Sequence, residues 1–167
     1  MRILGIDPGL DTTGYGIIEG VEGSLKLVEA GVIETTSKEP IQERVKKIYR
    51  GVSGLIGRFK PGALVLERIY SHYKHPTTAI LMGHSRGVVC LACGEKNIPL
   101  IHYPPARIKK AVTGNGNASK EQVQRMVQSI LKIDARGVPD DVTDALAAAL
   151  AHVFMTSHGS LVLNRSM

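Results

Sequence analysis

Four acidic residues stand at positions that would bring their carboxylates together. Asp7 and Glu67 each follow a short apolar run, so each one closes a predicted strand. Asp141 and Asp144 are three residues apart, which places both on one face of the first turn of a predicted helix. Since the carboxyl ends of parallel strands border the crevice where ligands bind in an α/β sheet, the sequence predicts that the four side chains converge.

Converging carboxylates point to divalent-metal chemistry. The acids repel one another, and without a cation some of them must take up protons. Hard oxygen ligands select Mg²⁺, with Mn²⁺ as a substitute. Two such ions about 4 Å apart can activate a water molecule and stabilise the leaving oxygen of a phosphodiester. The four acids therefore predict a two-metal nuclease site with water as the nucleophile.

Simpler structural roles explain some of these acids equally well. Asp7 precedes a Pro-Gly pair, so it could be a turn residue. Asp140 or Asp141 could cap the predicted helix, with Asp144 completing the box, and for that pair taken alone capping is the better explanation. Glu67 has no such role, because an acid at the end of a buried strand loses hydration unless it meets a cation.

The positive charge of the chain is concentrated in one segment. Twenty-one Lys and Arg face 15 Asp and Glu, which gives +6 and favours a polyanionic partner. Residues 96–132 hold seven basic residues against one acid, a net +6 that equals the whole excess. This clustering favours DNA over a lysine face that is merely solvated. The candidate DNA-binding residues of the segment are Arg107, Lys109, Lys110 and Lys120.

A further candidate contact follows Glu67. Residues 70–75 combine two tyrosines with a lysine and two histidines, a mixture that suits stacking on unpaired bases and binding of phosphate. An ordinary surface loop explains the same composition as well. Composition alone therefore leaves the two explanations equal.

The apolar patterns predict an α/β protein with a mixed five-stranded sheet flanked by helices. Three antiparallel strands come first, and two further strands run parallel. Strands are predicted at 2–6, 15–18, 24–33, 63–66 and 99–102, and helices at 40–59, 77–95, 105–112, 119–131 and 141–154. The first helix is expected to expose Arg44, and the fourth to begin with a capping box of Ser119 and Gln122.

Several classes of protein are excluded or disfavoured. No run approaches the roughly 18 apolar residues of a spanning helix, and the start lacks the layout of a signal peptide, so we expect a cytoplasmic protein with no membrane partner. Cys90 and Cys93 cannot by themselves make a four-thiolate zinc site, and we expect them to be core thiols.

Four blocks of the sequence resemble the RuvC family of Holliday junction resolvases. They lie at 3–16, 64–68, 114–123 and 140–147, and the resemblance runs over about residues 1–152 in the same order and spacing. The four acidic positions of the family fall on Asp7, Glu67, Asp141 and Asp144. Lys109 and Lys120 match family positions near the scissile phosphate, although a difference of one residue in length leaves Lys110 as an alternative to Lys109. The family also places an aromatic residue three positions after its glutamate, here Tyr70, so the resemblance implies that Tyr70 contacts DNA at the opened crossover.

The resemblance implies an RNase H-like fold, a homodimer, Mg²⁺ and paired symmetric nicks in a four-way DNA junction. Residues 1–156 would then form one nuclease domain and residues 157–167 a flexible C-terminal tail. A helix with Gly83 and Gly87 on one face is a candidate dimer interface. The resemblance also implies a branch-migration motor of the RuvA and RuvB type as a further partner.

Two other functions stay open at this point. The Asp-Pro-Gly and Thr-Thr-Gly motifs near the start also resemble the first phosphate loop of actin-like and sugar-kinase-like proteins, but those need two related domains and 167 residues hold one. A module that binds junctions without cutting them would keep the basic segment and would not need the four acids.

Overall fold

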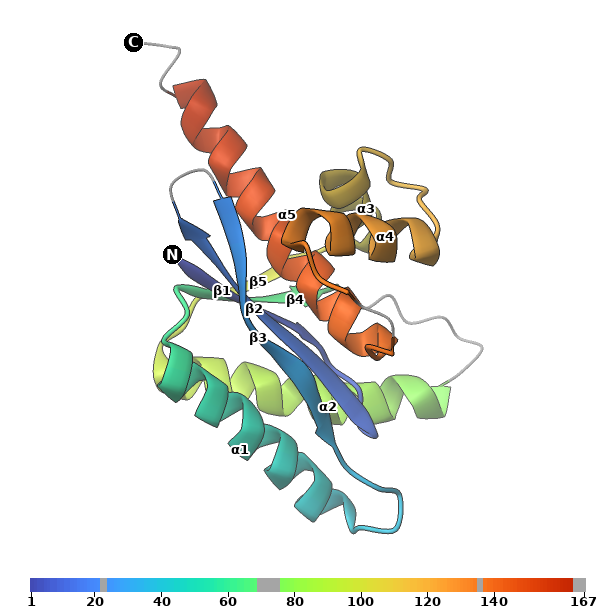
Figure 1. Ribbon diagram of the computed structural model, residues 1–167. Helices are drawn as coiled ribbons and strands as arrows, with labels where there is room; N and C mark the ends of the chain where they lie inside the picture. The colour runs from blue at the N-terminus through green and yellow to red at the C-terminus, as the bar shows by residue number, and fades with distance from the viewer. Residues whose placement is uncertain (22–23, 69–75, 135–136, 164–167) are drawn as a thin grey trace.

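A five-stranded mixed sheet forms the centre of the computed structural model, which describes residues 1–21, 24–68, 76–134 and 137–163 (Figure 1). The strand order is β3-β2-β1-β4-β5. The strands are β1 (Arg2–Asp7), β2 (Thr12–Val21), β3 (Ser24–Glu34), β4 (Ala63–Glu67) and β5 (Leu100–Tyr103). β1 to β3 pair antiparallel, and β1, β4 and β5 pair parallel, so the predicted arrangement of the sheet is confirmed.

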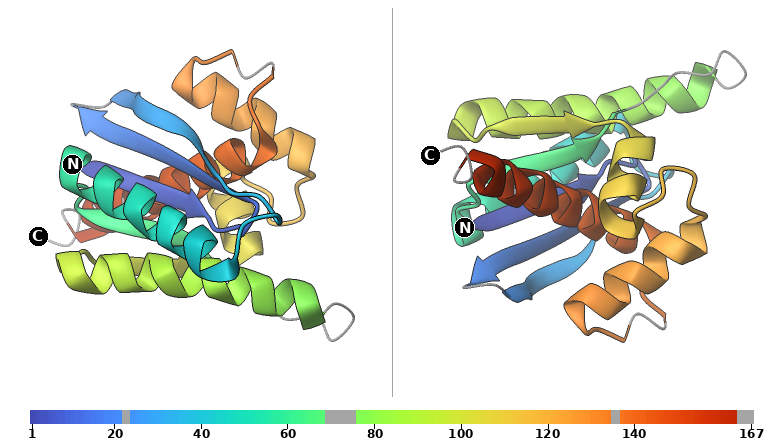
Figure 2. Two further views of the ribbon diagram at one scale, coloured as in Figure 1. Left: turned by 90° about the horizontal axis from the view of Figure 1, so that it is seen from below. Right: turned by 90° about the horizontal axis from the view of Figure 1, so that it is seen from above.

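Helices cover both faces of the sheet (Figure 2). One face carries α1 (Ile41–Phe59) and α2 (Pro76–Lys96), and the other carries α3 (Pro105–Thr113), α4 (Lys120–Leu131) and α5 (Asp140–Leu163). Neighbouring strand residues therefore enter opposite cores: Ile3 packs with α3 to α5, whereas Leu4 packs with α1 and α2. No helix in the described ranges is both long and apolar enough to cross a membrane.

The start of α1 corrects one prediction. Arg44 was expected on the exposed face of the helix, but it is only 8% exposed. Its Nε donates a hydrogen bond to Thr35 Oγ1 at 2.9 Å, and its Nη2 forms an ion pair with Asp11. Thr35 in turn donates to the carbonyl of Leu10 at 2.6 Å. The exposed-face prediction was wrong because the chain after β3 and the β1–β2 turn fold over this part of the helix.

The start of α4 agrees with the prediction from sequence, whereas the end of α5 differs from it. The capping box at the start of α4 is confirmed, since Ser119 Oγ accepts from Gln122 N at 3.3 Å and Gln122 Oε1 accepts from Ser119 N at 2.8 Å. α5 was expected to end near Phe154 and instead continues to Leu163. Residues 157–163, which we expected in a tail, thus extend this helix, and 164–167 lie outside the described residues.

Candidate active site

Two parallel strands bring the first two acids side by side. Ile6 of β1 pairs with Leu66 of β4, and the next residue of each strand is Asp7 or Glu67. The four residues before Glu67 are buried, whereas Glu67 itself is exposed. Both carboxylates therefore stand at the same edge of the sheet, where a ligand can reach them.

Two strand glycines allow α5 to bring the other two acids close. A Cβ atom added at Gly14 of β2 would lie 2.1 Å from the carbonyl oxygen of Asp141, and one added at Gly5 of β1 would lie 1.9 Å from that of Ala145. Both distances are far shorter than any real contact, so side chains at these positions would push the helix away. The first turn of α5, with Asp141 and Asp144, consequently lies directly over the end of β1.

The electrostatics show that the four carboxylates act on one another. The pKa of Asp7 is raised from an ordinary 3.8 to about 7, chiefly by burial. The charges of the other three acids contribute in the same direction, in the order Asp144, Asp141 and Glu67. Burial also raises the pKa of Glu67 and of Asp144. The four carboxylates therefore lie close enough for their charges to act on Asp7.

Two lysines join the carboxylates in one cavity of about 240 Å³. Lys109 of α3 and Lys120 of α4 line it together with Glu67 and Asp144. Lys120 Nζ lies 3.1 Å from Asp144 Oδ2, and the charges of both lysines lower the pKa of Glu67. The remaining wall consists of Pro105, Ile108, Val123 and Ala147. Carboxylates, ammonium groups and an apolar wall therefore meet in a space large enough for a phosphate.

The donor set fits Mg²⁺ in its chemistry. Four carboxylates offer hard oxygen ligands, and the raised pKa of Asp7 shows that their repulsion is only partly neutralised by Lys120. In the described part of the chain, no three His, Cys, Asp or Glu side chains are already arranged around one point that would hold a metal ion. Holding an ion therefore requires these side chains to turn toward it, and an ion bound by Asp144 would compete with Lys120 for its carboxylate.

The other candidate DNA contacts lie outside this cavity. Arg107 and Lys110 line a separate cavity of about 390 Å³ on α3 beside the last helix. The Arg107 guanidinium also lies 5.5 Å from the centre of the Tyr103 ring. Lys109, rather than Lys110, therefore faces the carboxylates. Tyr70 lies outside the described residues, so the structure does not place it.

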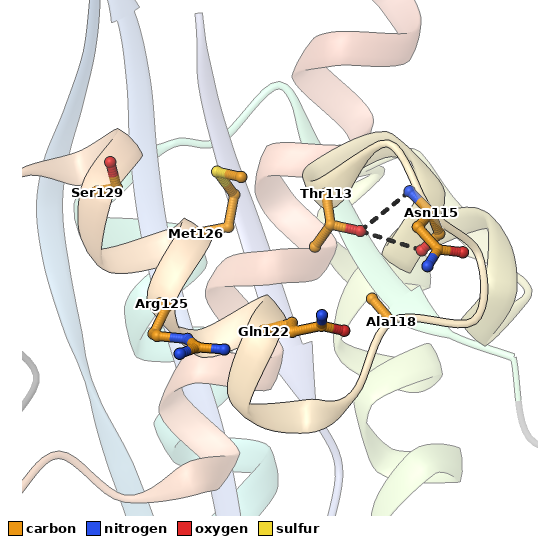
Figure 3. Close-up of a pocket in the computed structure, with 7 residues that line it drawn as sticks. All are labelled: Thr113, Asn115, Ala118, Gln122, Arg125, Met126 and Ser129. Atoms are coloured by element: carbon orange, nitrogen blue, oxygen red, sulfur yellow. Dashed lines mark hydrogen bonds between the residues drawn. The ribbon is translucent and has the colours of Figure 1, made fainter.

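A third cavity, of about 340 Å³, lies between α4 and the loop that precedes it (Figure 3). Its polar wall includes Arg125, Gln122 and Asn115, and Met126 lies exposed at its edge. Thr113 Oγ1 holds the loop by accepting from Asn115 N at 3.1 Å. None of the lining residues is acidic, so this cavity is separate from the carboxylate site.

Two residues at the site were missed by sequence reasoning. Arg86 of α2 donates from Nη1 to the carbonyl oxygen of Glu67 at 2.7 Å and so fixes the end of β4 from the opposite face of the sheet. Asp140, considered only as a helix cap, forms an ion pair with Lys120. Both contacts join elements that are distant in sequence, and no local pattern signals them.

Comparison with known proteins identifies the family. Residues 3–152 match the family of crossover junction endodeoxyribonuclease RuvC. The chain belongs to the RuvC family. A RuvC of Rhodopirellula baltica is 44% identical over 156 residues, which cover 93% of this chain and 88% of that protein. The resemblance drawn from the sequence blocks is therefore confirmed.

Solved structures of the family agree with the fold. Thermus thermophilus RuvC matches with a TM-score of 0.86 at 35% identity, covering 95% of this chain and 97% of that one. The T. thermophilus protein in complex with Holliday junction substrate matches with a TM-score of 0.88 at 34% identity, covering 95% and 96%. The RNase H-like fold expected from the sequence is confirmed.

Proposed function

We propose that this protein is a structure-selective endodeoxyribonuclease that resolves four-way DNA junctions by paired symmetric nicks during recombination and repair. The observation that carries the proposal is the meeting of four carboxylates and two lysines at one edge of the sheet, in a chain of the RuvC family. Support for the substrate comes from the Thermus relative, which is described in complex with Holliday junction substrate.

Asp7, Glu67, Asp141 and Asp144 would hold Mg²⁺, two ions in each site, with Mn²⁺ as a substitute. The ions would supply activation of the attacking water and stabilisation of the leaving oxygen. The chain contributes the ligand charge and its position: β1 and β4 fix two of the acids, and α5 presents the other two. The raised pKa of Asp7 supports this proposal, because a bound cation would relieve the repulsion that causes part of the shift.

Lys109 and Lys120 would bind the phosphate that is to be cut. They line the cavity from α3 and α4 together with Glu67 and Asp144, beside the space that a phosphate would occupy. Charge-assisted hydrogen bonds to the phosphate oxygens would oppose the negative charge that builds up as water attacks. The apolar wall, which includes Ile108, would exclude other water from the phosphate.

Contacts to DNA away from the cut would come from the rest of the basic segment. Arg107 and Lys110 are both exposed on α3, next to the carboxylate cavity along the same helix. They would bind neighbouring phosphates and set the register of the strand without reading its sequence. Tyr70, three residues after Glu67 in the chain, is proposed to stack on a base at the opened crossover.

A homodimer would supply the two active sites that paired nicks require. α2 exposes a stripe of Ile80, Gly83, Gly87, Leu91 and Gly94, which recur at helical spacing. Ile80 is 63% and Leu91 is 53% exposed, and a Cβ atom added at any of these glycines would meet nothing within 4 Å. Apolar residues beside open glycines suit close contact with the same helix of a second copy.

Two expectations about the cellular setting remain part of the proposal. The enzyme would act in the cytoplasm, where bacterial DNA is found, and a branch-migration motor of the RuvA and RuvB type would deliver the junction to it. The net charge of +6 supports the DNA partner through the polyanionic backbone.

The decisive experiment uses a synthetic four-way junction with each strand labelled in turn. Wild-type protein with Mg²⁺ is expected to cut two like strands at symmetric positions, and Mn²⁺ is expected to replace Mg²⁺. Asp7→Asn is expected to bind the junction but to cut it at least about 10³-fold more slowly, since removal of a metal ligand removes the charge on which the chemistry depends.

Two controls separate this function from its alternatives. Linear duplex of the same sequence is expected to stay intact, and addition of EDTA is expected to stop cleavage of the junction. Junction binding without any metal-dependent nick would support the non-catalytic alternative. Cleavage by Asp7→Asn at the wild-type rate would show that the metal site is assigned to the wrong residues.

A further inference from the structure

Asp140 lies beside the carboxylate site and contacts the lysine that enters it. Lys120 Nζ is 3.2 Å from Asp140 Oδ2 and 3.1 Å from Asp144 Oδ2, so a single ammonium group bridges two carboxylates of α5. Asp140 is itself held from a second direction, since Gln124 Nε2 donates to Asp140 Oδ1 at 2.8 Å. Each oxygen of this carboxylate therefore has its own partner on α4.

The two partners of Asp140 come from one face of α4. Lys120 and Gln124 are four residues apart, which places them one above the other on the helix. The capping box of Ser119 and Gln122 fixes the start of the same helix. Asp140 thus joins the first turn of α5 to the first turn of α4, the two turns that supply acids and a lysine to the cavity.

Lys120 needs such a partner because Asp144, its other contact, is also a proposed metal ligand. A lysine side chain has many rotamers, and this one is about half exposed, so it does not hold one position unaided. In the proposed function Asp144 would bind a metal ion, which would compete with the lysine for the same carboxylate. Asp140 is 62% exposed and is not one of the four proposed metal ligands, so it remains available as the permanent partner.

We propose that Asp140 is a positioning residue that keeps the Lys120 ammonium at the cavity when Asp144 is engaged elsewhere, through the clamp formed with Gln124. This inference rests on the proposed function, since it assigns Lys120 to the phosphate. Asp140 itself contacts neither the phosphate nor the metal ions. The charge of Asp140 also raises the pKa of Asp144, so the positioning effect proposed here is the part that passes through the lysine.

The sign of the expected effect distinguishes positioning from simple electrostatics. Asp140→Asn removes a negative charge beside the basic segment, which by charge alone would strengthen binding of DNA. Positioning predicts the opposite for the chemical step: the cleavage rate of fully bound junction falls by about tenfold or more because the lysine is misplaced. Junction affinity measured in EDTA is expected to be unchanged or higher, and Asp140→Glu is expected to retain most of the rate.

Glu121→Gln provides a matched control. Glu121 is an exposed acid in the first turn of α4, its carboxylate accepts from Ser119 Oγ at 2.7 Å, and no described ion pair joins it to Lys120. The substitution makes the same change in net charge at almost the same place. It is expected to leave the cleavage rate of bound junction at the wild-type value.

Two further measurements show whether the effect passes through the lysine. In a Lys120→Met background, Asp140→Asn is expected to slow cleavage no further. In metal-free protein without DNA, ¹⁵N relaxation of the Lys120 ammonium group is expected to report greater motion in Asp140→Asn than in wild type or Glu121→Gln. Thermal unfolding of each variant confirms that the fold is kept, which the exposure of Asp140 leads us to expect.

The outcomes separate the inference from the function on which it rests. Wild-type protein that fails to cut junctions contradicts the proposed function. Wild-type protein that cuts, together with Asp140→Asn at the same rate, overturns the positioning role and leaves the function intact. An equal loss of rate from Asp140→Asn in the presence and absence of Lys120 also overturns it, because the effect would then reach the site by another route.

Discussion

Asp7 bears the main electrostatic conflict of the site. The pKa of Asp7 is raised more strongly than that of Glu67 or Asp144, because Asp7 lies at the partly buried end of β1 and the charges of three other acids act on it. The type and spacing of these residues predicted their convergence from sequence alone, since strand ends and a helical first turn are local features. The partners that fix them were not predictable in this way: Arg86 reaches Glu67 only because α2 packs across β4.

The shifted pKa of Asp7 predicts a stability effect that can be measured without DNA. With the folded pKa at about 7 and an ordinary value of 3.8, the native state binds more protons than the unfolded state between these pH values. The free energy of unfolding of metal-free wild type therefore falls as pH rises from about 4 to about 7, by about 2 kcal/mol after allowance for screening. This fall in the free energy of unfolding is not expected in Asp7→Asn, because asparagine does not titrate.

Thermal unfolding in EDTA at pH 5 and at pH 8 measures the difference. Asp7→Asn is expected to be more stable than wild type at pH 8 by several degrees, and the advantage is expected to shrink at pH 5. Mg²⁺ is expected to raise the Tm of wild type at pH 8 and to leave that of Asp7→Asn nearly unchanged. Parallel pH dependence in the two proteins would contradict the assigned pKa.

The elements that position the site meet through unusually close backbone contact. α5 lies on β1 and β2 at glycines whose missing side chains make room for it. The apolar runs, the turn residues and the helical stripes predicted almost every element, because these patterns reflect local geometry and burial. Arg44 was predicted to be exposed but is buried, and α5 was predicted to be too short. Both features depend on contacts with segments that are distant in the sequence.

A pair of glycine substitutions tests the close contact. Gly14→Ala is expected to lower stability by about 1–3 kcal/mol, because the new methyl group would overlap the backbone of Asp141. It is also expected to slow junction cleavage more than this loss of stability explains, since Asp141 must move. Thermal unfolding and single-turnover cleavage below the Tm measure the two effects.

Gly54→Ala is the matched control for this pair. Gly54 lies exposed in α1, where an added Cβ atom meets nothing within 4 Å. Alanine favours the helix over glycine by about 1 kcal/mol, so this variant is expected to be slightly more stable and fully active. Similar losses of stability in both variants would argue against a specific contact at Gly14.

On the scale of the whole molecule, the basic segment meets the acids at one cavity, to which it contributes two lysines. The acids gather at one edge of the sheet, while the +6 of residues 96–132 comes from α3, α4 and their flanks. Net charge alone predicted a polyanionic partner, but only the three-dimensional arrangement shows Lys109 facing the acids and Lys110 outside the cavity. The helix with Gly83 and Gly87 was already a candidate dimer interface from the sequence, and the structure adds that Ile80 and Leu91 are exposed on it.

Leu91→Glu is expected to convert the proposed homodimer to a monomer. A charge on the exposed stripe of α2 would oppose the pairing of two copies, and because Leu91 is 53% exposed the fold itself is expected to persist. Sedimentation at micromolar concentration measures the oligomeric state, and a junction cleavage assay is expected to show single uncoupled nicks. Ile41→Glu, which alters a 42% exposed residue on α1, is the control expected to remain dimeric. A dimeric Leu91→Glu protein would place the interface elsewhere.

The path of the chain through the site also bears on protein synthesis. Asp7 comes from the first strand and Asp141 and Asp144 from the last helix, so a growing polypeptide exposes its basic segment before α5 exists. Until that helix emerges and settles on the sheet, two of the four carboxylates are missing. A chain that stops before α5 therefore carries only two of the four carboxylates, and the order of the elements delays completion of the site until α5 packs on the sheet.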